Sequence, residues 1–236
     1  LVQGGHLILA WLEGVAPRAM DVVVSESKDY GNTWSTPFSI SESPSNSANP
    51  TLYAFTADDG TLGAAILWEN TTTKKINASA WHGKEWTNNA WTPPHTLSSG
   101  EGESRDVCVT GKGSALFAVW ENESPDSKST RLSFATSDDG GMSWSADKPI
   151  VMSPSNIGGD PSVTIGLNNG IYLGYQVRIQ VHLAKSMDHG RTFKYLGPLG
   201  NGLFAHVVSN VGGVVAVSWE NFKGNMKDGA IKTVGL

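Results

Sequence analysis

One eight-residue pattern that carries groups suited to acid–base or cation chemistry occurs three times in the chain. Residues 27–34 read SKDYGNTW, residues 137–144 read SDDGGMSW and residues 186–193 read SMDHGRTF. Each copy follows Ser-X-Asp-X-Gly-X-Thr/Ser-aromatic, and a carboxylate beside a hydroxyl could act as a general base or as a cation ligand. The fixed positions are Ser27, Asp29, Gly31 and Trp34, then Ser137, Asp139, Gly141 and Trp144, then Ser186, Asp188, Gly190 and Phe193.

The spacing of these acids favours a structural role. A catalytic site needs groups that converge, and one carboxylate per turn is fewer than the roughly six to eight oxygen ligands that Ca²⁺ prefers. An Asp in a turn accepts hydrogen bonds from backbone N–H groups a few residues on, and a glycine allows positive φ, which we expect at Gly31, Gly140 and Gly190. A fourth copy, AWHGKEW at residues 80–86, keeps the glycine and the tryptophan without the acid. We therefore predict that the three acids hold turns and that each motif's aromatic ring packs inward against its sheet.

A second motif repeats in phase with the first. Residues 68–70, 120–122 and 219–221 each read Trp-Glu-Asn, with looser matches at residues 11–13 and 175–176. The aromatic residues that end the Asp motifs follow one another at intervals of 52, 58 and 49 residues, from Trp34 through Trp86 and Trp144 to Phe193. Internal repetition at about fifty residues is typical of arrays of one supersecondary unit.

Each repeat contains four short strand patterns and no helical period. An Asn/Asp-Pro opens the first strand, at residues 50–55 and 161–166, with a further copy at 203–210. Apolar runs ending in the aromatic-Glu pair form the second strand, at 7–11, 64–68, 115–120 and 214–219, with a fifth copy ending at Tyr175. The third strand leads into the Asp motif, at 20–27, 75–81, 130–137 and 179–186, with a last copy at 228–235, and the fourth begins at the motif's aromatic residue.

Four antiparallel strands per repeat predict an all-β fold, a β-propeller with about five four-stranded blades in a single domain over residues 1–236. A solenoid and a sandwich are the alternatives. The first blade lacks its first strand and the last blade lacks its fourth, so either the two partial blades close the ring or the chain is part of a larger propeller. An open ring would expose strand edges, through which the protein could self-associate.

The Ser-X-Asp-X-Gly-X-Thr/Ser-aromatic motif resembles the Asp-box of the sialidase-like (BNR-repeat) propellers. Residues 21–34, DVVVSESKDYGNTW, look like the first boxed blade of bacterial sialidases. The resemblance covers essentially the whole chain. It implies that the box is structural and lies away from the functional site.

Candidate ligand-binding residues therefore belong to the face opposite the Asp motifs, because successive turns of an up-and-down blade open on opposite faces. They are expected in the loops of that face or beside them: Glu13, Arg18, Glu69, Arg105, Asp106, Trp120, Glu121, Arg131, Tyr175, Arg178 and Glu220. The recurring Trp-Glu-Asn motif has two interpretations, a contact between blades or a set of sugar pockets, since an aromatic face with a carboxylate and an amide suits a sugar. Tyr175 takes the Trp position of the repeat, which favours a place in the core.

The resemblance does not extend to a full catalytic set. It implies hydrolysis of a glycosidic bond beside a carboxylate, with three arginines, a Tyr nucleophile assisted by a Glu, and an Asp as acid/base. The chain has no Arg-Ile-Pro motif and no Tyr after Tyr195, so the catalytic residues stay unassigned. We expect a non-catalytic propeller that binds a glycan or a small-molecule ligand. A sialidase-type glycoside hydrolase (exo-α-sialidase) and a protein-interaction scaffold are the alternatives.

Composition and short motifs narrow the remaining classes of function and location. The chain has 236 residues, a net charge of −5 and no basic stripe, which argues against a nucleic-acid partner. No apolar run approaches the roughly 20 residues that a membrane helix needs. No HEXXH, paired cysteine or Gly-rich phosphate loop occurs, so neither a metal site nor a cofactor is predicted, and the single Cys108 excludes an intrachain disulfide. A secreted, cell-surface or periplasmic location is favoured over the cytoplasm, and the chain, which starts at Leu1, contains no signal peptide.

Overall fold

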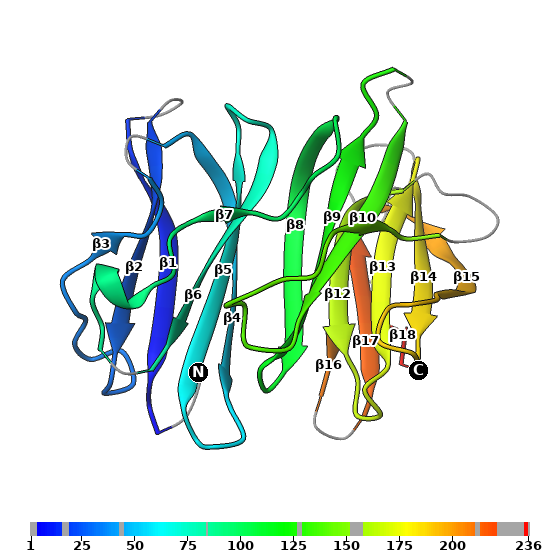
Figure 1. Cartoon of the computed structure of the whole chain (residues 1–236). Helices are drawn as coiled ribbons and strands as arrows, with labels where there is room; N and C mark the ends of the chain where they lie inside the picture. The colour runs from blue at the N-terminus through cyan, green and yellow to red at the C-terminus, as the bar shows by residue number, and fades with distance from the viewer. Residues whose placement is uncertain are drawn as a thin grey trace.

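Five antiparallel sheets stand side by side in the computed structural model (Figure 1). The structure describes residues 4–15, 19–42, 45–83, 85–126, 129–151, 158–210, 213–220 and 234–235. Sheet order follows chain order within every sheet, so each sheet is an up-and-down blade. We number the blades 1 to 5 along the chain.

The strands of each blade have the following bounds. Blade 1 holds β1 (Leu7–Gly14), β2 (Met20–Ser27) and β3 (Phe38–Ser39). Blade 2 holds β4 (Ser47–Thr56), β5 (Leu62–Asn70), β6 (Lys75–His82) and β7 (His95–Thr96), with the short 3₁₀ turn η1 (Asn88–Ala90) before β7. Blade 3 holds β8 (Glu103–Lys112), β9 (Ala115–Glu123), β10 (Thr130–Ser137) and β11 (Lys148–Pro149). Blade 4 holds β12 (Gly159–Ile165), β13 (Ile171–Val177), β14 (Gln180–Ser186) and β15 (Lys194–Asn201). Blade 5 holds β16 (Leu203–Ser209), β17 (Val215–Glu220) and β18 (Val234–Gly235).

This architecture confirms the predicted all-β fold of four-stranded antiparallel blades. The first strands of neighbouring blades pack against one another, β4 against β8, β8 against β12 and β12 against β16. The fourth strands differ from the prediction, because they begin several residues after the aromatic of the Asp motif, apart from β15, which begins directly after it. In blades 1, 2 and 3 a loop takes up the residues after the turn, and only two residues pair at the outer edge.

The hydrophobic core lies between blades rather than within one blade. Ala64, Ile66 and Trp68 of β5 face blade 1, while Ala65 and Leu67 of the same strand face blade 3. Both faces of the second strand are therefore covered, which explains its uninterrupted apolar sequence. The aromatic residue near the end of this strand packs against the preceding blade in four cases: Trp68, Trp120, Tyr175 and Trp219.

The three Asp motifs form turns with the same hydrogen bonds. Asp29 accepts from the Thr33 N–H at 2.8 Å, from the Thr33 hydroxyl at 2.6 Å and from the Ser27 hydroxyl at 2.8 Å. The Ser27 hydroxyl oxygen accepts from the Gly31 N–H at 2.8 Å. The equivalent groups around Asp139 and Asp188 repeat this pattern. Each acid thus replaces the strand partners that a tight turn removes.

The aromatic residues of the three motifs do not all pack alike. Trp144 packs against the cluster between blades 2 and 3, and Phe193 against the cluster between blades 3 and 4. Trp34, in contrast, is 43% exposed, so the prediction of an inward-packing ring is wrong for this copy. The physical reason is that Trp144 and Phe193 contact a core cluster shared with the preceding blade, whereas no such cluster of described residues includes Trp34.

Candidate functional site

The blades present two faces of different chemistry. Asp29, Asp139 and Asp188 mark one face, which we call the Asp-turn face. The ends of β1, β5, β9 and β13, where each strand pairs with the start of the strand after it, and the starts of the first strands lie on the other, which we call the loop face. In Figure 1 the loop face is uppermost.

A β-bulge recurs near the start of the first strand in four blades. The register shifts between Ala48 and Thr51, and again at the corresponding place in β8, β12 and β16. One residue in each bulge has left-handed backbone geometry, with φ of 47° at Asn49, 52° at Asp106, 46° at Asp160 and 53° at Phe204. Sequence reasoning placed Arg105 and Asp106 in a loop, and the structure corrects this because strand pairing continues on both sides of the bulge.

A glutamate from the preceding blade supplies a partner for the N–H group at two of these bulges. Asp106 N donates to Glu69 Oε1 at 2.7 Å, and Asp160 N donates to Glu121 Oε2 at 3.3 Å. Glu69 and Glu121 are 8% and 5% exposed. The Glu of Trp-Glu-Asn therefore links each of these blades to the next, as expected from the interpretation of the motif as a contact between blades.

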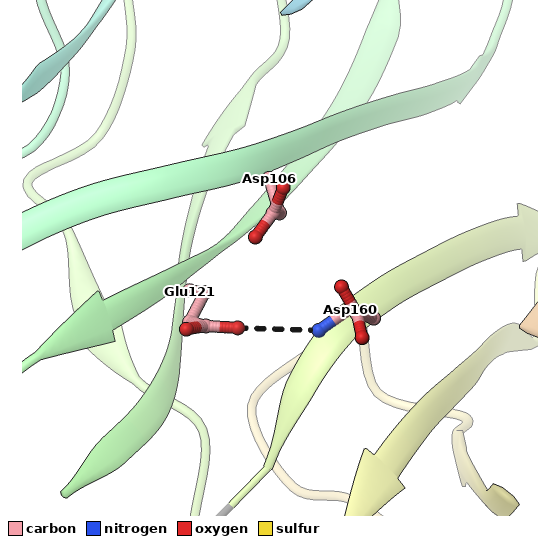
Figure 2. A group of neighbouring side chains, drawn as sticks. All are labelled: Asp106, Glu121 and Asp160. Carbon is pink, nitrogen blue, oxygen red and sulfur yellow. Dashed lines mark hydrogen bonds between the residues drawn. The ribbon is translucent and has the colours of Figure 1, made fainter. Parts of the chain in front are cut away.

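Charged side chains gather around these bulges in what we call the Arg105 cluster: Arg105, Asp106, Glu121, Glu123 and Asp160. The Arg105 guanidinium donates from Nε to Glu121 Oε1 at 2.8 Å and from Nη1 to Glu123 Oε2 at 3.1 Å, and its Nε lies 3.7 Å from Asp106 Oδ2. Carboxylate oxygens of Asp106, Glu121 and Asp160 lie within 4.8 Å of one another. Figure 2 shows them coming from three strands, with Asp106 and Asp160 on the first strands β8 and β12 and Glu121 on β9.

Burial, together with neighbouring negative charge, shifts the titration of this cluster. Burial, and then the neighbouring Glu121 carboxylate, raise the pKa of Asp106 to about 6. Burial also raises the pKa of Glu121, against the opposing effect of the Arg105 guanidinium. A carboxyl group that holds a proton near neutral pH can donate as well as accept a hydrogen bond.

The chemistry of the donor set suits hydroxyl groups better than a cation. With one ligand oxygen from each, the three carboxylates supply fewer ligands than the roughly six to eight oxygens that Ca²⁺ prefers, and Arg105 already neutralises Glu121. The side chains of Arg105 and Asp106 are 38% and 39% exposed, so both reach solvent from a fixed position. A fixed guanidinium beside carboxyl groups can bind a polyol with paired hydrogen bonds.

The other candidates from the sequence lie elsewhere. Trp120 is 0% exposed and Tyr175 is 2% exposed, and this corrects their place among ligand-binding residues, because rings buried between blades offer no surface to a ligand. The Tyr175 ring stacks on His182 with a centroid separation of 5.5 Å, and burial raises its pKa. In the described part of the chain, no hydrogen bond or ion pair joins the cluster to the exposed candidates, which are Glu13, Arg131, Arg178 and Glu220. Arg18 lies outside the described residues.

A small polar cleft of about 190 Å³ also lies on the loop face, between blades 1 and 2. Its lining includes Asn46, Trp68, Asn70, Thr72 and Thr73. Asn70 Oδ1 accepts from the N–H groups of Thr72 at 3.1 Å and Thr73 at 3.0 Å, which fixes the turn. The sequence reasoning missed the two threonines, although the run of hydroxyl residues directly after Trp-Glu-Asn was a visible signal.

Solved structures with the same fold show which class of protein this architecture defines. A protein of unknown function from Dyadobacter fermentans matches 100% of this chain and 77% of its own, with 18% identity and a TM-score of 0.65. A Hadza microbial sialidase matches 99% of this chain and 55% of its own, with 14% identity and a TM-score of 0.64. The GH93 α-L-arabinofuranosidase of Fusarium graminearum, solved with arabinobiose, matches 98% of this chain and 71% of its own, with 11% identity and a TM-score of 0.64.

The likeness defines a sialidase-like β-propeller fold. No protein-family model matches the chain, and no curated protein sequence matches it. At these identities the comparisons establish architecture and not activity. Within the described residues, no helix is long and apolar enough to cross a membrane.

Proposed function

We propose that the chain binds carbohydrate on its loop face, through the Arg105 cluster, without hydrolysing it. The observation that carries this proposal is the fixed, half-exposed group of Arg105, Asp106 and Asp160 on first strands beside the axis of the blades. Strand backbone and buried Glu121 hold these groups in place, so little conformational entropy is lost when a ligand binds. Structural neighbours that are named as sialidases and as an arabinofuranosidase support a glycan as the ligand.

Arg105 is already paired with acidic side chains of the protein itself, and this supports ligand binding rather than sialidase chemistry. Its guanidinium already contacts Glu121, Glu123 and Asp106. The resemblance implies three arginines that hold the carboxylate of the substrate. An arginine neutralised by three acids is a poor partner for a further carboxylate.

A glycan array followed by calorimetric titration of the best ligand tests the proposal. We expect the double variant Asp106→Asn/Asp160→Asn to bind about tenfold more weakly, because two acceptors for hydroxyl groups are lost at roughly 0.5–1.5 kcal/mol each. Asp58→Asn is the matched control, since Asp58 is exposed in the β4–β5 turn on the Asp-turn face. Equal affinity of the double variant and the control would reject the Arg105 cluster as the site, and an array with no binding by the folded protein would reject the function.

Hydrolysis is the second candidate, because one observation favours it. A carboxyl with a pKa of about 6 beside other carboxylates is the arrangement that glycosidases use for a general acid. Fluorogenic glycosides, a sialoside among them, test it directly. If the protein is a hydrolase, it should turn over one of these substrates, and Asp106→Asn should abolish this activity while Asp58→Asn retains it. A folded protein that turns over none of the substrates would exclude hydrolysis.

A further inference from the structure

A cleft of about 680 Å³ opens on the Asp-turn face between blades 3 and 4, away from the Arg105 cluster. Its walls come from the β8–β9 and β12–β13 turns, from β9, β10 and β11, and from the third Asp motif. Neither the proposed glycan site nor the turn-holding role of the Asp motifs uses this space.

The repeat shows why this space is open between blades 3 and 4. Phe55 pairs with Gly63, five residues before Trp68, and it packs edge-on against His82 at a centroid distance of 5.6 Å. A Cβ added at Gly140 would meet Phe55 at 2.3 Å, so this ring pair fills the space between blades 2 and 3.

One blade further on, the residues that fill this space are replaced. Lys112 pairs with Ala115, which lies five residues before Trp120, just as Gly63 lies five residues before Trp68. Lys112 therefore occupies the position that Phe55 has in blade 2. Asp138 follows Ser137 at the place of His82, and His189 takes the Gly140 position of the motif. A flexible cation and two exposed polar side chains stand where the earlier interface has packed rings.

The floor and the rim of the cleft differ in chemistry. Phe117 and Phe134, stacked with centroids 5.2 Å apart, form the floor together with Ile165 and Ile171. The rim carries the cations Lys112, Lys148 and Arg191, with Asp138 as the one acid among the lining residues. The lining thus has a formal charge of +2 in a chain whose net charge is −5. Lys112 Nζ donates to Asn169 Oδ1 at 2.8 Å, which holds this cation at the mouth.

We propose that this cleft binds a small organic anion, a carboxylate, sulfate or phosphate carried on an apolar ring or short chain. The volume falls within the roughly 300–1,000 Å³ of small-molecule sites, which combine an apolar lining with a few charged groups. The apolar body lies against Phe134 and Ile165, and the anionic group meets Lys148 and Arg191. Because the cleft is on the Asp-turn face, its occupancy is independent of glycan binding on the loop face.

Fluorescence titration with 8-anilinonaphthalene-1-sulfonate, an apolar anion, tests the charge requirement. We expect Lys148→Gln/Arg191→Gln to weaken its binding at least about fivefold, since two cations that face the sulfonate are removed. Lys28→Gln/Lys74→Gln is the matched control, because it removes the same charge from exposed lysines elsewhere and should change affinity less than about twofold. The neutral probe N-phenyl-1-naphthylamine should bind both double variants equally.

The repeat also supplies a variant that tests the cavity itself. Lys112→Phe/Asp138→His/His189→Gly introduces the residues that fill the interface between blades 2 and 3, with the glycine that leaves room for the two rings, and it should abolish binding of both probes. Circular dichroism melting checks that each variant folds, and the glutamine variants, at exposed positions, remain informative if the filling variant does not. Unchanged probe binding in the filling variant, or equal weakening in the two glutamine double variants, would overturn the proposal.

Discussion

The same residue type, aspartate, serves opposite purposes at two places in this protein because its surroundings differ. Hydrogen bonds from the hydroxyl and N–H of Thr33 hold the pKa of Asp29 at about 2, and the equivalent Thr192 does the same for Asp188. At Asp106, burial and adjacent carboxylates raise the pKa to about 6. The aspartates of the Asp motifs therefore stay ionised and hold their turns, while Asp106 gains or loses a proton near neutral pH.

The raised pKa of Asp106 predicts the direction in which the stability of the folded protein changes with pH. The folded protein binds the proton of Asp106 more tightly than the unfolded chain does. The protonated carboxyl therefore adds to the free energy of unfolding below the ordinary aspartate pKa, roughly 4, and this stabilisation is lost as pH rises through about 6. Asp106→Asn cannot ionise, and we expect it to be more stable than the wild type above that pH and to lose this advantage at low pH. Urea unfolding across this pH range measures the difference. Asp58→Asn serves as the control, and a variant less stable than the wild type at high pH would contradict the assignment.

At the scale of the elements, one strand position has different burial according to the neighbouring blade. The aromatic near the end of the second strand is buried where it packs against the preceding blade, as at Trp120, and the aromatic of the Asp motif is partly buried by the same kind of contact at Trp144. In blade 1, by contrast, Trp34 is 43% exposed. The packing unit is therefore the interface between two blades and not the single blade.

Alanine substitution at two tryptophans should measure this interface. Trp120→Ala empties a fully buried position, and we expect it to lower the free energy of unfolding by about 3–5 kcal/mol. Trp34→Ala removes a half-exposed ring with one hydrogen bond, from Nε1 to the Gly31 carbonyl, and should cost about 1 kcal/mol. Urea unfolding monitored by circular dichroism gives both values. Equal losses would contradict the assignment of Trp120 to the interblade core.

At the scale of the whole molecule, the two candidate binding regions lie on opposite faces. The acids of the Arg105 cluster lie on the loop face, and the cations of the cleft lie on the Asp-turn face. Exposed apolar side chains occur in several blades, with Leu9 49% exposed in blade 1 and Ile179 59% exposed in blade 4. Successive blades are held together by separate interfaces, so separation of two neighbouring blades should be observable as a local event.

Cys108 reports the separation of blades 3 and 4. Its thiol donates to the Pro161 carbonyl of the next blade at 3.3 Å, and burial raises its pKa to about 12. We expect the folded protein to react with Ellman's reagent at mildly alkaline pH far more slowly than the unfolded chain, because the nucleophile is the thiolate. Reaction of the folded protein at the rate seen in denaturing urea would show that the interface is open in solution.

The sequence alone determined the repeat, the first three strands of the repeat, the Asp turns and the existence of two faces. These features follow from local pattern and period: an apolar run ends in Trp-Glu, an Asp motif follows each third strand, and antiparallel order then fixes which turns share a face. A turn motif such as the one at Asp29 carries its hydrogen-bond partners within seven residues, so no distant segment is needed to predict it.

Only the tertiary structure decided which residues meet across blades. Asp106, Glu121 and Asp160 come together because two bulges turn their backbone N–H groups toward glutamates of the preceding blade, and sequence spacing does not specify a bulge. The exposure of Trp34 and the cleft beside Lys112 likewise depend on what the neighbouring blade supplies. These contacts depend on packing between residues that are far apart in the sequence. A sequence repeat predicts which residues each blade contains, but it does not predict which spaces between blades those residues leave unfilled.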